Sequence, residues 1–209
     1  MIVAGAKGFA KEIVEICWQL GMTDDVCLFD DVNTNLPGRL FDQFEILTEI
    51  SKAAEHFEIV DRRFVLGVGT PYARRTLAGK LEKIGGSLQG LISPLSHIGH
   101  FDIEIGAGVT VMTSSIITSS VSIGDGTLIN KSCIISHDVR IGEYCDIAPD
   151  VKVMGGVCIG SDSFVGAGSV IVPNVSIGDF VTVGAGSVVT RHVADGVTVA
   201  GIPAKILKS

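Results

Sequence analysis

One histidine of this chain stands beside an aspartate in a setting that suits proton transfer. His137 and Asp138 are adjacent, and histidine is the side chain whose unperturbed pKa is nearest to neutral pH. A positioned imidazole can remove a proton from an amine or a hydroxyl while that group attacks an electrophilic carbon. Asp138 could orient the imidazole or balance its charge, although a solvated turn aspartate explains this residue equally well. We therefore expect His137 to be a general base, with Asp138 as its candidate partner.

The segment around His137 repeats every six residues. An aliphatic residue recurs at each sixth position from Ile105 to Val189 without a gap. A second column of small or β-branched residues, such as Val139 and Cys145, follows four positions after the first. Neither a helix period nor a strand period explains this spacing, whereas three short parallel strands for each eighteen-residue coil do. The repeat therefore predicts a triangular β-helix of about five coils, with both columns pointing inward.

The periodicity places His137 outside both inward columns, at the edge of a strand or turn. It is the one histidine in the middle of the repeat, since His56, His97, His100 and His192 lie outside the repeat or at its ends. Gly155 stands eighteen residues later and should lie on the same edge, about 4.8 Å along the stack. A glycine leaves its backbone N–H open to an oxygen that becomes negatively charged. We expect Gly155 to supply such an oxyanion contact.

Another column at the same spacing contains Pro149, Ala167 and Ala185. It should lie on a different edge of the triangle, where small residues leave a groove against the His137 edge of a neighbouring subunit. The wall of one prism is too flat to enclose a substrate. We therefore expect each site to draw on two chains.

Residues 1–92 do not follow the hexad pattern and alternate between strands and helices. Apolar strands are expected at residues 2–4, 26–29 and 64–69, with helices after Gly8 and from near Pro71. This arrangement predicts an α/β domain of the βαβ type, a Rossmann-like half. We expect residues 93–209 to form the second domain, a parallel β-helix followed by a short C-terminal tail, and its hexapeptide signature resembles that of the left-handed β-helix superfamily.

The turn after the first expected strand contains Gly5 and Gly8, and Asp30 ends the second strand. Glycine-rich turns let backbone amides approach a phosphate, and a carboxylate at the next strand end can accept hydrogen bonds from a ribose or a base. The full dinucleotide spacing is missing, so a turn-forming glycine remains the alternative. The pattern favours a half-site for a nucleotide.

Composition excludes several classes of protein. The chain has 46% hydrophobic and 19% charged residues, which excludes a disordered polymer. A formal charge of −7 without a basic run argues against nucleic acid and anionic membranes as partners. No apolar stretch reaches the roughly 18 residues that a membrane span needs. The five cysteines show no metal or redox spacing, and the histidines do not converge, so we expect a cytoplasmic protein without a metal.

The whole chain resembles the bacterial nucleotide-sugar acetyltransferases of the sialic-acid O-acetyltransferase type, which include N-acetyltransferases of nucleotide-linked amino sugars. The matching stretches are residues 5–12, 29–31 and 67–69 with Arg74, then 136–138, 141–142 and 201–205. The resemblance implies a homotrimer that uses acetyl-CoA to N-acetylate a nucleotide-linked 4-amino-4,6-dideoxy sugar for surface glycan or glycoprotein biosynthesis.

The resemblance also implies roles for particular residues. Gly155, Ala167 and Ala185 would contact acetyl-CoA. The nucleotide sugar would bind at six positions: Gly8, Phe9, Asp30, Asp31, Gly67 and Gly69.

The sequence leaves five points open. The acceptor could be a sialic acid or another sugar that is O-acetylated, or the chain could be a non-catalytic trimeric sugar-binding scaffold. The nucleotide is undetermined among UDP, dTDP, GDP and CMP, and the acyl group could be longer than acetyl. Asp146 stands where some members of the group have a second histidine, and the sequence assigns it no role.

Overall fold

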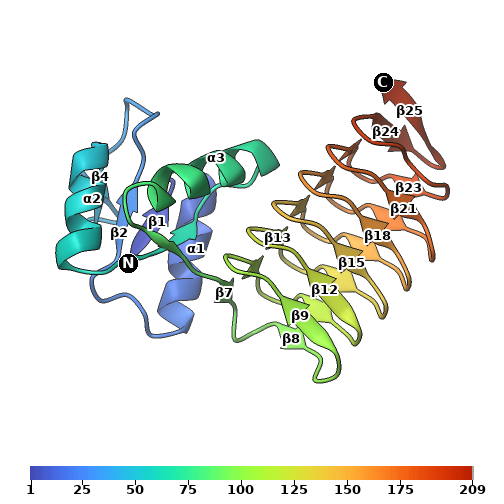
Figure 1. Ribbon diagram of the computed structural model, residues 1–209, viewed down its shortest axis with the longest axis horizontal. Helices are drawn as coiled ribbons and strands as arrows, with labels where there is room; N and C mark the ends of the chain where they lie inside the picture. Colours follow the sequence, from blue (N-terminus) through green and yellow to red (C-terminus); the bar gives the residue numbers. More distant parts are fainter. Residues whose placement is uncertain (209) are drawn as a thin grey trace.

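The computed structural model describes residues 1–208, which form an N-terminal α/β domain and a long β-helix (Figure 1). The N-terminal sheet has the order β3-β4-β2-β1-β5-β6, and only the β3–β4 pair is antiparallel. Its strands are β1 (Ile2–Ala4), β2 (Cys27–Phe29), β3 (Arg39–Leu40), β4 (Phe44–Leu47), β5 (Arg63–Leu66) and β6 (Ser87–Leu88). Parallel strands leave their carboxyl ends on one edge of the sheet, where ligands bind in open α/β folds.

Three helices cover the two faces of this sheet. They are α1 (Gly8–Gln19), α2 (Ile50–Ile59) and α3 (Pro71–Glu82). On one face, α1 buries Ile13 and Ile16; on the other, α2 and α3 bury Phe57 and Leu81. The sequence predicted β1, α1, β2, β5 and α3, although β5 ends at Leu66, earlier than expected. It did not predict α2 or the β3–β4 hairpin.

The C-terminal part is a left-handed parallel β-helix of the hexapeptide type, as predicted. Its first face contains β7 (Leu91–Ile92), β10 (Thr110–Val111), β13 (Leu128–Ile129), β16 (Asp146–Ile147), β19 (Phe164–Val165), β22 (Thr182–Val183), β24 (Thr198–Gly201) and the antiparallel β25 (Ala204–Lys208). The second contains β8 (His97–Ile98), β11 (Ile116–Ile117), β14 (Ile134–Ile135), β17 (Lys152–Val153), β20 (Val170–Ile171) and β23 (Val188–Val189). The third contains β9 (Ile103–Ile105), β12 (Val121–Ile123), β15 (Arg140–Ile141), β18 (Cys158–Ile159) and β21 (Ser176–Ile177).

The eighteen-residue coil sets the register between strands. Ile117 pairs with Ile135, which pairs with Val153, so identical positions of successive coils stack in the interior. The predicted inward columns form one buried core along the prism. Strand β7 lies immediately before residue 93 and already pairs with β10 of the prism. The division of the chain at residue 92 stays a prediction.

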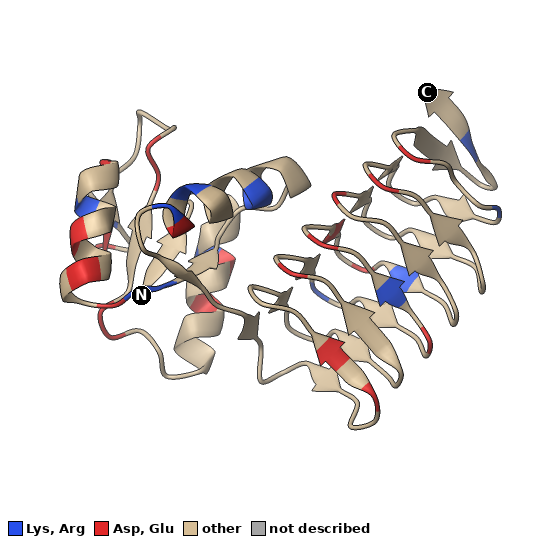
Figure 2. Ribbon diagram, in the orientation of Figure 1, with Lys and Arg blue, Asp and Glu red and all other residues tan. Residues whose placement is uncertain are grey.

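Each corner of the coil needs one residue in the left-handed backbone region. Asp138, Asp150 and Asp162 occupy such positions, with φ values of 61°, 61° and 56°. Aspartate is one of the few L-residues that adopt this conformation readily. Acidic residues recur on successive turns (Figure 2). Some of their side chains cap the backbone of the preceding coil, as when Ser161 N–H donates to Asp179 Oδ1 at 2.7 Å.

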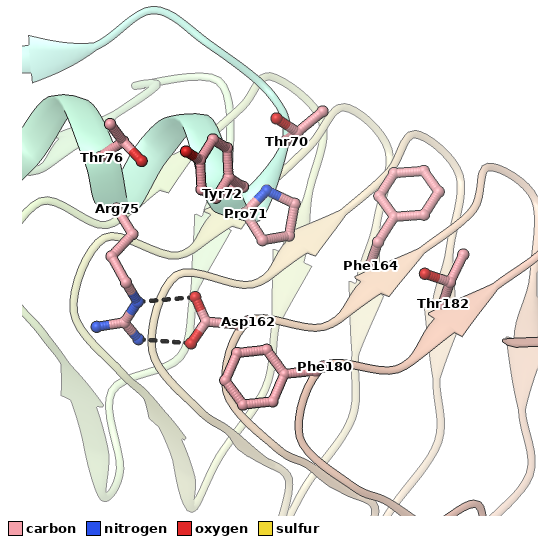
Figure 3. A pocket seen from close by; sticks show the side chains of 9 residues that line it. All are labelled: Thr70, Pro71, Tyr72, Arg75, Thr76, Asp162, Phe164, Phe180 and Thr182. Carbon is pink, nitrogen blue, oxygen red and sulfur yellow. Dashed lines mark hydrogen bonds and ion pairs between the residues drawn. The ribbon is translucent and has the colours of Figure 1, made fainter. Parts of the chain in front are cut away.

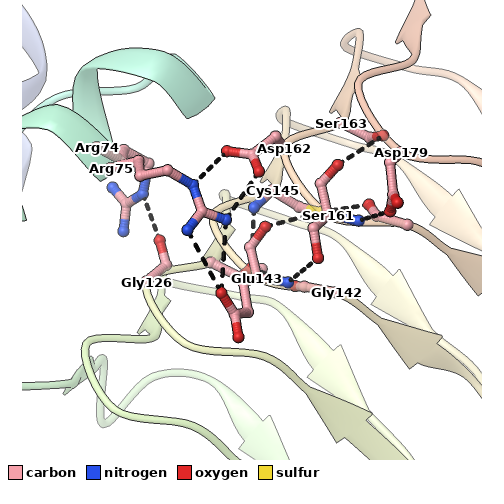
Figure 4. A network of polar contacts seen from close by, with 12 residues as sticks. Arg74, Arg75, Gly126, Gly142, Glu143, Cys145, Ser161, Asp162, Ser163 and Asp179 are labelled. Atoms are coloured by element: carbon pink, nitrogen blue, oxygen red, sulfur yellow. Dashed lines mark hydrogen bonds and ion pairs between the residues drawn. The ribbon is translucent and has the colours of Figure 1, made fainter. Parts of the chain in front are cut away.

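The two domains share a buried joint. Leu91, Met112 and Leu128 of the β-helix belong to the apolar cluster beneath α1. Two arginines of α3 reach the β-helix at the same joint, Arg74 from a fully buried position and Arg75 near the surface (Figure 4). These contacts hold the N-terminal sheet against the first face. Among the described residues, no helix is long and apolar enough to cross a membrane.

Candidate active site

His137 and Asp138 form a hydrogen-bonded pair on the turn between β14 and β15. His137 Nδ1 lies 2.7 Å from Asp138 Oδ2, and the two side chains are 67% and 66% exposed. An ionised carboxylate can only accept a hydrogen bond, so Nδ1 carries the proton and donates it. Nε2 of the neutral ring then keeps its lone pair free. The pair is therefore arranged for proton removal by Nε2.

Gly155 lies beneath this imidazole. A Cβ atom at Gly155 would be 2.6 Å from His137 Cε1 and 2.7 Å from Nε2, so no larger residue fits without displacing the ring. The backbone agrees, because Gly156 N–H donates to His137 O at 3.0 Å across the two coils. The structure thus brings together the two positions that the eighteen-residue period related. The oxyanion role of Gly155 stays a prediction.

The column of Pro149, Ala167 and Ala185 follows the strands of the first face. It lies on the edge between the first and second faces, whereas His137 lies between the second and third. Gly168 N–H donates to Pro149 O, and Gly186 N–H to Ala167 O, so the column stacks coil on coil. Ala167 and Ala185 are exposed. Their contact with acetyl-CoA stays a prediction.

A pocket of about 350 Å³ lies at the carboxyl ends of β1, β2 and β5. Gly5, Asp30, Asp31 and Val68 line it, together with residues of α3. Gly67 does not line this pocket. It packs closely against β1, since a Cβ atom at Gly67 would be 2.8 Å from a methyl group of Val3. Four of the six residues expected to bind the nucleotide sugar do not line the pocket: Gly67 and Gly69 flank Val68, and Gly8 and Phe9 begin α1.

The two aspartates of this pocket have different environments. The Asp30 carboxylate accepts hydrogen bonds from the backbone N–H groups of Ala6, Val32 and Asn33, and from Asn33 Nδ2. Asp31 instead pairs with Lys80 of α3. Asp30 therefore shapes the loop, while the Asp31–Lys80 pair is the more accessible charged group.

The comparisons with known proteins agree with this geometry. Residues 1–81 match the family model of the PglD N-terminal domain, and residues 120–155, 138–171 and 156–191 match that of the bacterial transferase hexapeptide (six repeats). A mutant of perosamine N-acetyltransferase from Caulobacter crescentus, solved with CoA and GDP-perosamine, is 30% identical with a TM-score of 0.91, over 100% of this chain and 96% of that chain. This chain belongs to the hexapeptide-repeat nucleotide-sugar acetyltransferases.

Other solved structures are similar to this acetyltransferase over nearly its whole length. The acetyltransferase domain of PglB from Neisseria gonorrhoeae is 27% identical with a TM-score of 0.90, over 99% of this chain and 98% of that chain. WeeI from Acinetobacter baumannii is 25% identical with a TM-score of 0.73, over the same shares. A search of curated proteins gave no match. The enzyme is thus an acyltransferase, as the sequence predicted.

Sequence reasoning missed the residues that α3 contributes to the pocket. Tyr72, Thr76 and Lys80 line it from one face of that helix. Their spacing of four residues was visible in the sequence, and such residues share a helix face. This spacing identifies pocket residues only when the helix is known to lie beside β2.

Asp146 is a buried acid of the β-helix. Its side chain lies on the first face, 6% exposed, and Oδ1 has no hydrogen-bond partner among the described residues. Burial raises the pKa of Asp146 to about 7, and the nearby Arg74 guanidinium opposes this rise. Arg74 donates to Gly126 O at 2.7 Å and to Val68 O at 2.8 Å. Burial lowers the pKa of Arg74 to about 10, so this residue stays protonated at neutral pH.

Two cysteines of the prism, Cys133 and Cys145, and the candidate metal ligands do not point to a second chemistry in the described part of the chain. No group of three or more His, Cys, Asp or Glu residues is placed to hold a metal ion among residues 1–208. Cys133 and Cys145 are buried in the prism, and burial raises the pKa of each thiol to about 12. Such thiols are poor nucleophiles at neutral pH.

Proposed function

We propose that this acetyltransferase transfers the acetyl group of acetyl-CoA to the amine of a nucleotide-linked 4-amino-4,6-dideoxy sugar, in the biosynthesis of a surface glycan or glycoprotein. The His137–Asp138 pair beside Gly155 carries the proposal, because it offers a free Nε2 next to an open backbone. Acetyl-CoA is the acyl donor, and no metal takes part. The relatives with CoA and GDP-perosamine or acetyl-CoA support this choice of substrates.

The reaction proceeds by direct attack of the amine on the thioester. The amine nitrogen forms a bond to the carbonyl carbon while His137 Nε2 removes its proton. The C–S bond then breaks, and the proton passes from His137 to the CoA thiolate. Asp138 holds the imidazolium that forms in between, through Nδ1. No enzyme nucleophile is needed, which agrees with the buried positions of Cys133 and Cys145.

Gly155 and the column of Pro149, Ala167 and Ala185 would bind acetyl-CoA, the acyl donor. The Gly155 N–H donates no hydrogen bond to any described residue, so it is free for the carbonyl oxygen as negative charge develops there. Ala167 and Ala185, with Pro149, leave a shallow strip along an edge for the pantetheine arm. The pocket of Asp31 and Lys80 would hold the nucleotide, with the Gly5–Gly8 turn and the start of α1 near its phosphates.

The position of this pocket supports a trimer with shared sites. The nucleotide pocket adjoins the first face, whereas His137 lies between the second and third faces of the same chain. The outer surface of the second face carries Ile116, Ile134, Val170 and Val188, with Lys152 between Ile134 and Val170, and Ile116 is 41% exposed. A mainly apolar strip of this kind is typical of an interface. A second copy covering it would bring its own His137 edge to the acceptor.

An assay with paired acceptors tests the function. Release of the CoA thiol and the mass of the product are measured with nucleotide sugars that carry an amine or a hydroxyl at C4. We expect transfer to the amine, and a loss of about 10² to 10⁴ in kcat for His137→Ala with little change in KM for acetyl-CoA. His100→Ala is the matched control, since that side chain is also exposed and lies outside the site.

The alternatives give different results in the same assay. Exclusive acetylation of the hydroxyl, or of a sialic acid, would assign the enzyme to the O-acetyltransferases and leave the role of His137 standing. Binding without transfer to any acceptor would indicate a sugar-binding scaffold. Light scattering that shows a stable, active monomer would exclude the shared site. We place the enzyme in the cytoplasm, where its five unpaired cysteines stay reduced.

A further inference from the structure

A second cavity adjoins the nucleotide pocket. It has a volume of about 590 Å³ and lies between the first turn of α3 and the coils of the β-helix that carry Phe164 and Phe180 (Figure 3). Tyr72 and Thr76 line both cavities. A nucleotide sugar bound in the nucleotide pocket could therefore extend past α3. The group attached to its diphosphate would then lie in this second cavity.

Aromatic rings form much of this cavity. Tyr72 and Pro71 contribute from α3, Phe164 from β19 and Phe180 from the turn after β21. Tyr72 is 82% exposed and Phe180 66% exposed, which is unusual for side chains of this size. Two large rings left open around one cavity suit a ligand with apolar faces.

Phe180 occupies a backbone conformation that a bulky residue adopts rarely. Its φ is 55°, and the equivalent positions one coil before and one coil after are Asp162 and Gly196. Aspartate and glycine suit this conformation, whereas phenylalanine is strained there. Strain of this kind persists where the surrounding structure imposes it, often at ligand sites. Here the corner of the coil imposes it, and the ring lies beside the cavity (Figure 3).

The charged groups of the cavity neutralise each other. Arg75 Nε and Nη2 donate to the two oxygens of Asp162, each at 2.7 Å. The remaining polar groups are hydroxyls, those of Thr70, Thr76 and Thr182 among them. A phosphate would find no unpaired cation here, whereas a neutral sugar ring would find hydroxyl partners and aromatic faces.

We propose that this cavity holds the hexose of the acceptor and that Phe164 and Phe180 select a methyl group at C5 of the sugar over a hydroxymethyl group. The inference rests on the proposed function and adds the residues that set sugar specificity. A methyl group packs against the two rings, while the hydroxyl of a hydroxymethyl group would lose its water without gaining a partner. Apolar pockets discriminate against one added hydroxyl by about 10²-fold at most, so we expect a preference of roughly ten- to hundredfold.

The test compares two acceptors that differ by one oxygen. These are the UDP-linked 4-amino-4,6-dideoxy hexose and the UDP-linked 4-amino-4-deoxy hexose, with the GDP-linked pair measured alongside. We expect kcat/KM to favour the 6-deoxy member of a pair, and Phe180→Ala and Phe164→Ala to bring the ratio close to one. Phe180 is the safer variant because its exposed ring contributes little to folding. KM for acetyl-CoA should not change.

Phe101→Ala is the matched control, since Phe101 is 78% exposed and lies on a turn that does not line the cavity. Calorimetric titration of the same sugars and of UDP and GDP, without acetyl-CoA, repeats the comparison without relying on transfer. The native protein should bind the 6-deoxy member more tightly, and Phe180→Ala should remove that difference without weakening the binding of the free diphosphates. The proposal is wrong if the native protein shows no preference in either experiment, or if both phenylalanine variants keep it. Binding selectivity without transfer would instead count against the proposed function alone.

Discussion

The imidazole of His137 lies directly against Gly155, its counterpart one coil further along the β-helix. A Cβ atom at Gly155 would come within 2.6 Å of the ring, so the position of the base depends on the absence of a side chain there.

Gly155→Ala should lower kcat by roughly 10²-fold, because a displacement of about 1 Å is enough to misalign a base. The fold should survive, since Gly155 has no positive φ and the ring that must move is exposed. Gly79→Ala is the control, as a Cβ there meets nothing within 4 Å. Steady-state kinetics and a thermal melt distinguish the two effects. Unchanged kcat in Gly155→Ala would show that the ring does not need its present position.

Asp138→Asn should lower kcat by roughly 10- to 100-fold. The amide cannot hold the imidazolium as a carboxylate does, and it no longer fixes the tautomer with the proton on Nδ1. Asparagine tolerates the φ of 61°, so the turn is kept. Asp102→Asn, on the same edge two coils earlier with a φ of 56°, is the control. Equal kinetics for both variants would mean that Asp138 is an ordinary turn residue.

Arg74→Met should destabilise the protein by about 3–5 kcal/mol. The substitution leaves the carbonyl oxygens of Gly126 and Val68 without their donor and removes the cation near buried Asp146. Arg75→Gln should cost only about 0.2–1 kcal/mol, because its ion pairs are solvated and Arg75 is 44% exposed. Urea denaturation measures both. Similar losses for the two variants would contradict the assignment of Arg74 as the buried link between the domains.

Asp146→Asn should flatten the dependence of stability on pH. Burial raises the pKa of Asp146 from 3.8 to about 7, so between these values the folded chain holds a proton that the unfolded chain has lost. This group therefore destabilises the protein progressively as pH rises from about 4 to about 7, by a few kcal/mol in all. Asparagine cannot ionise, and the variant should gain stability relative to the native protein above pH 7. Melting temperatures at pH 5 and pH 8 test this, and parallel changes in the two proteins would show that Asp146 does not titrate in that window.

The sequence by itself determined the β-helix and the surroundings of His137. A six-residue period from Ile105 to Val189 has one structural solution, because an aliphatic side chain must point inward at each short strand of every coil. The same arithmetic placed Gly155 beside His137 and put Ala167 and Ala185 on another edge. In a repeat fold, sequence separation converts directly into distance, so local spacing is enough to relate such residues.

Only the tertiary structure decided how the N-terminal domain contributes. Asp30 and Asp31 are adjacent residues of the same type, yet their environments differ. The Asp30 carboxylate accepts hydrogen bonds from nearby backbone N–H groups, whereas Asp31 pairs with Lys80, 49 residues away in the sequence. The cavity of Tyr72, Phe164 and Phe180 exists because Arg74 and the apolar joint hold α3 against the first face. No period links these positions. Their proximity arises from the packing of two different folds. The relative placement of these folds depends on buried contacts between residues that are distant in the sequence, and local spacing does not determine such contacts.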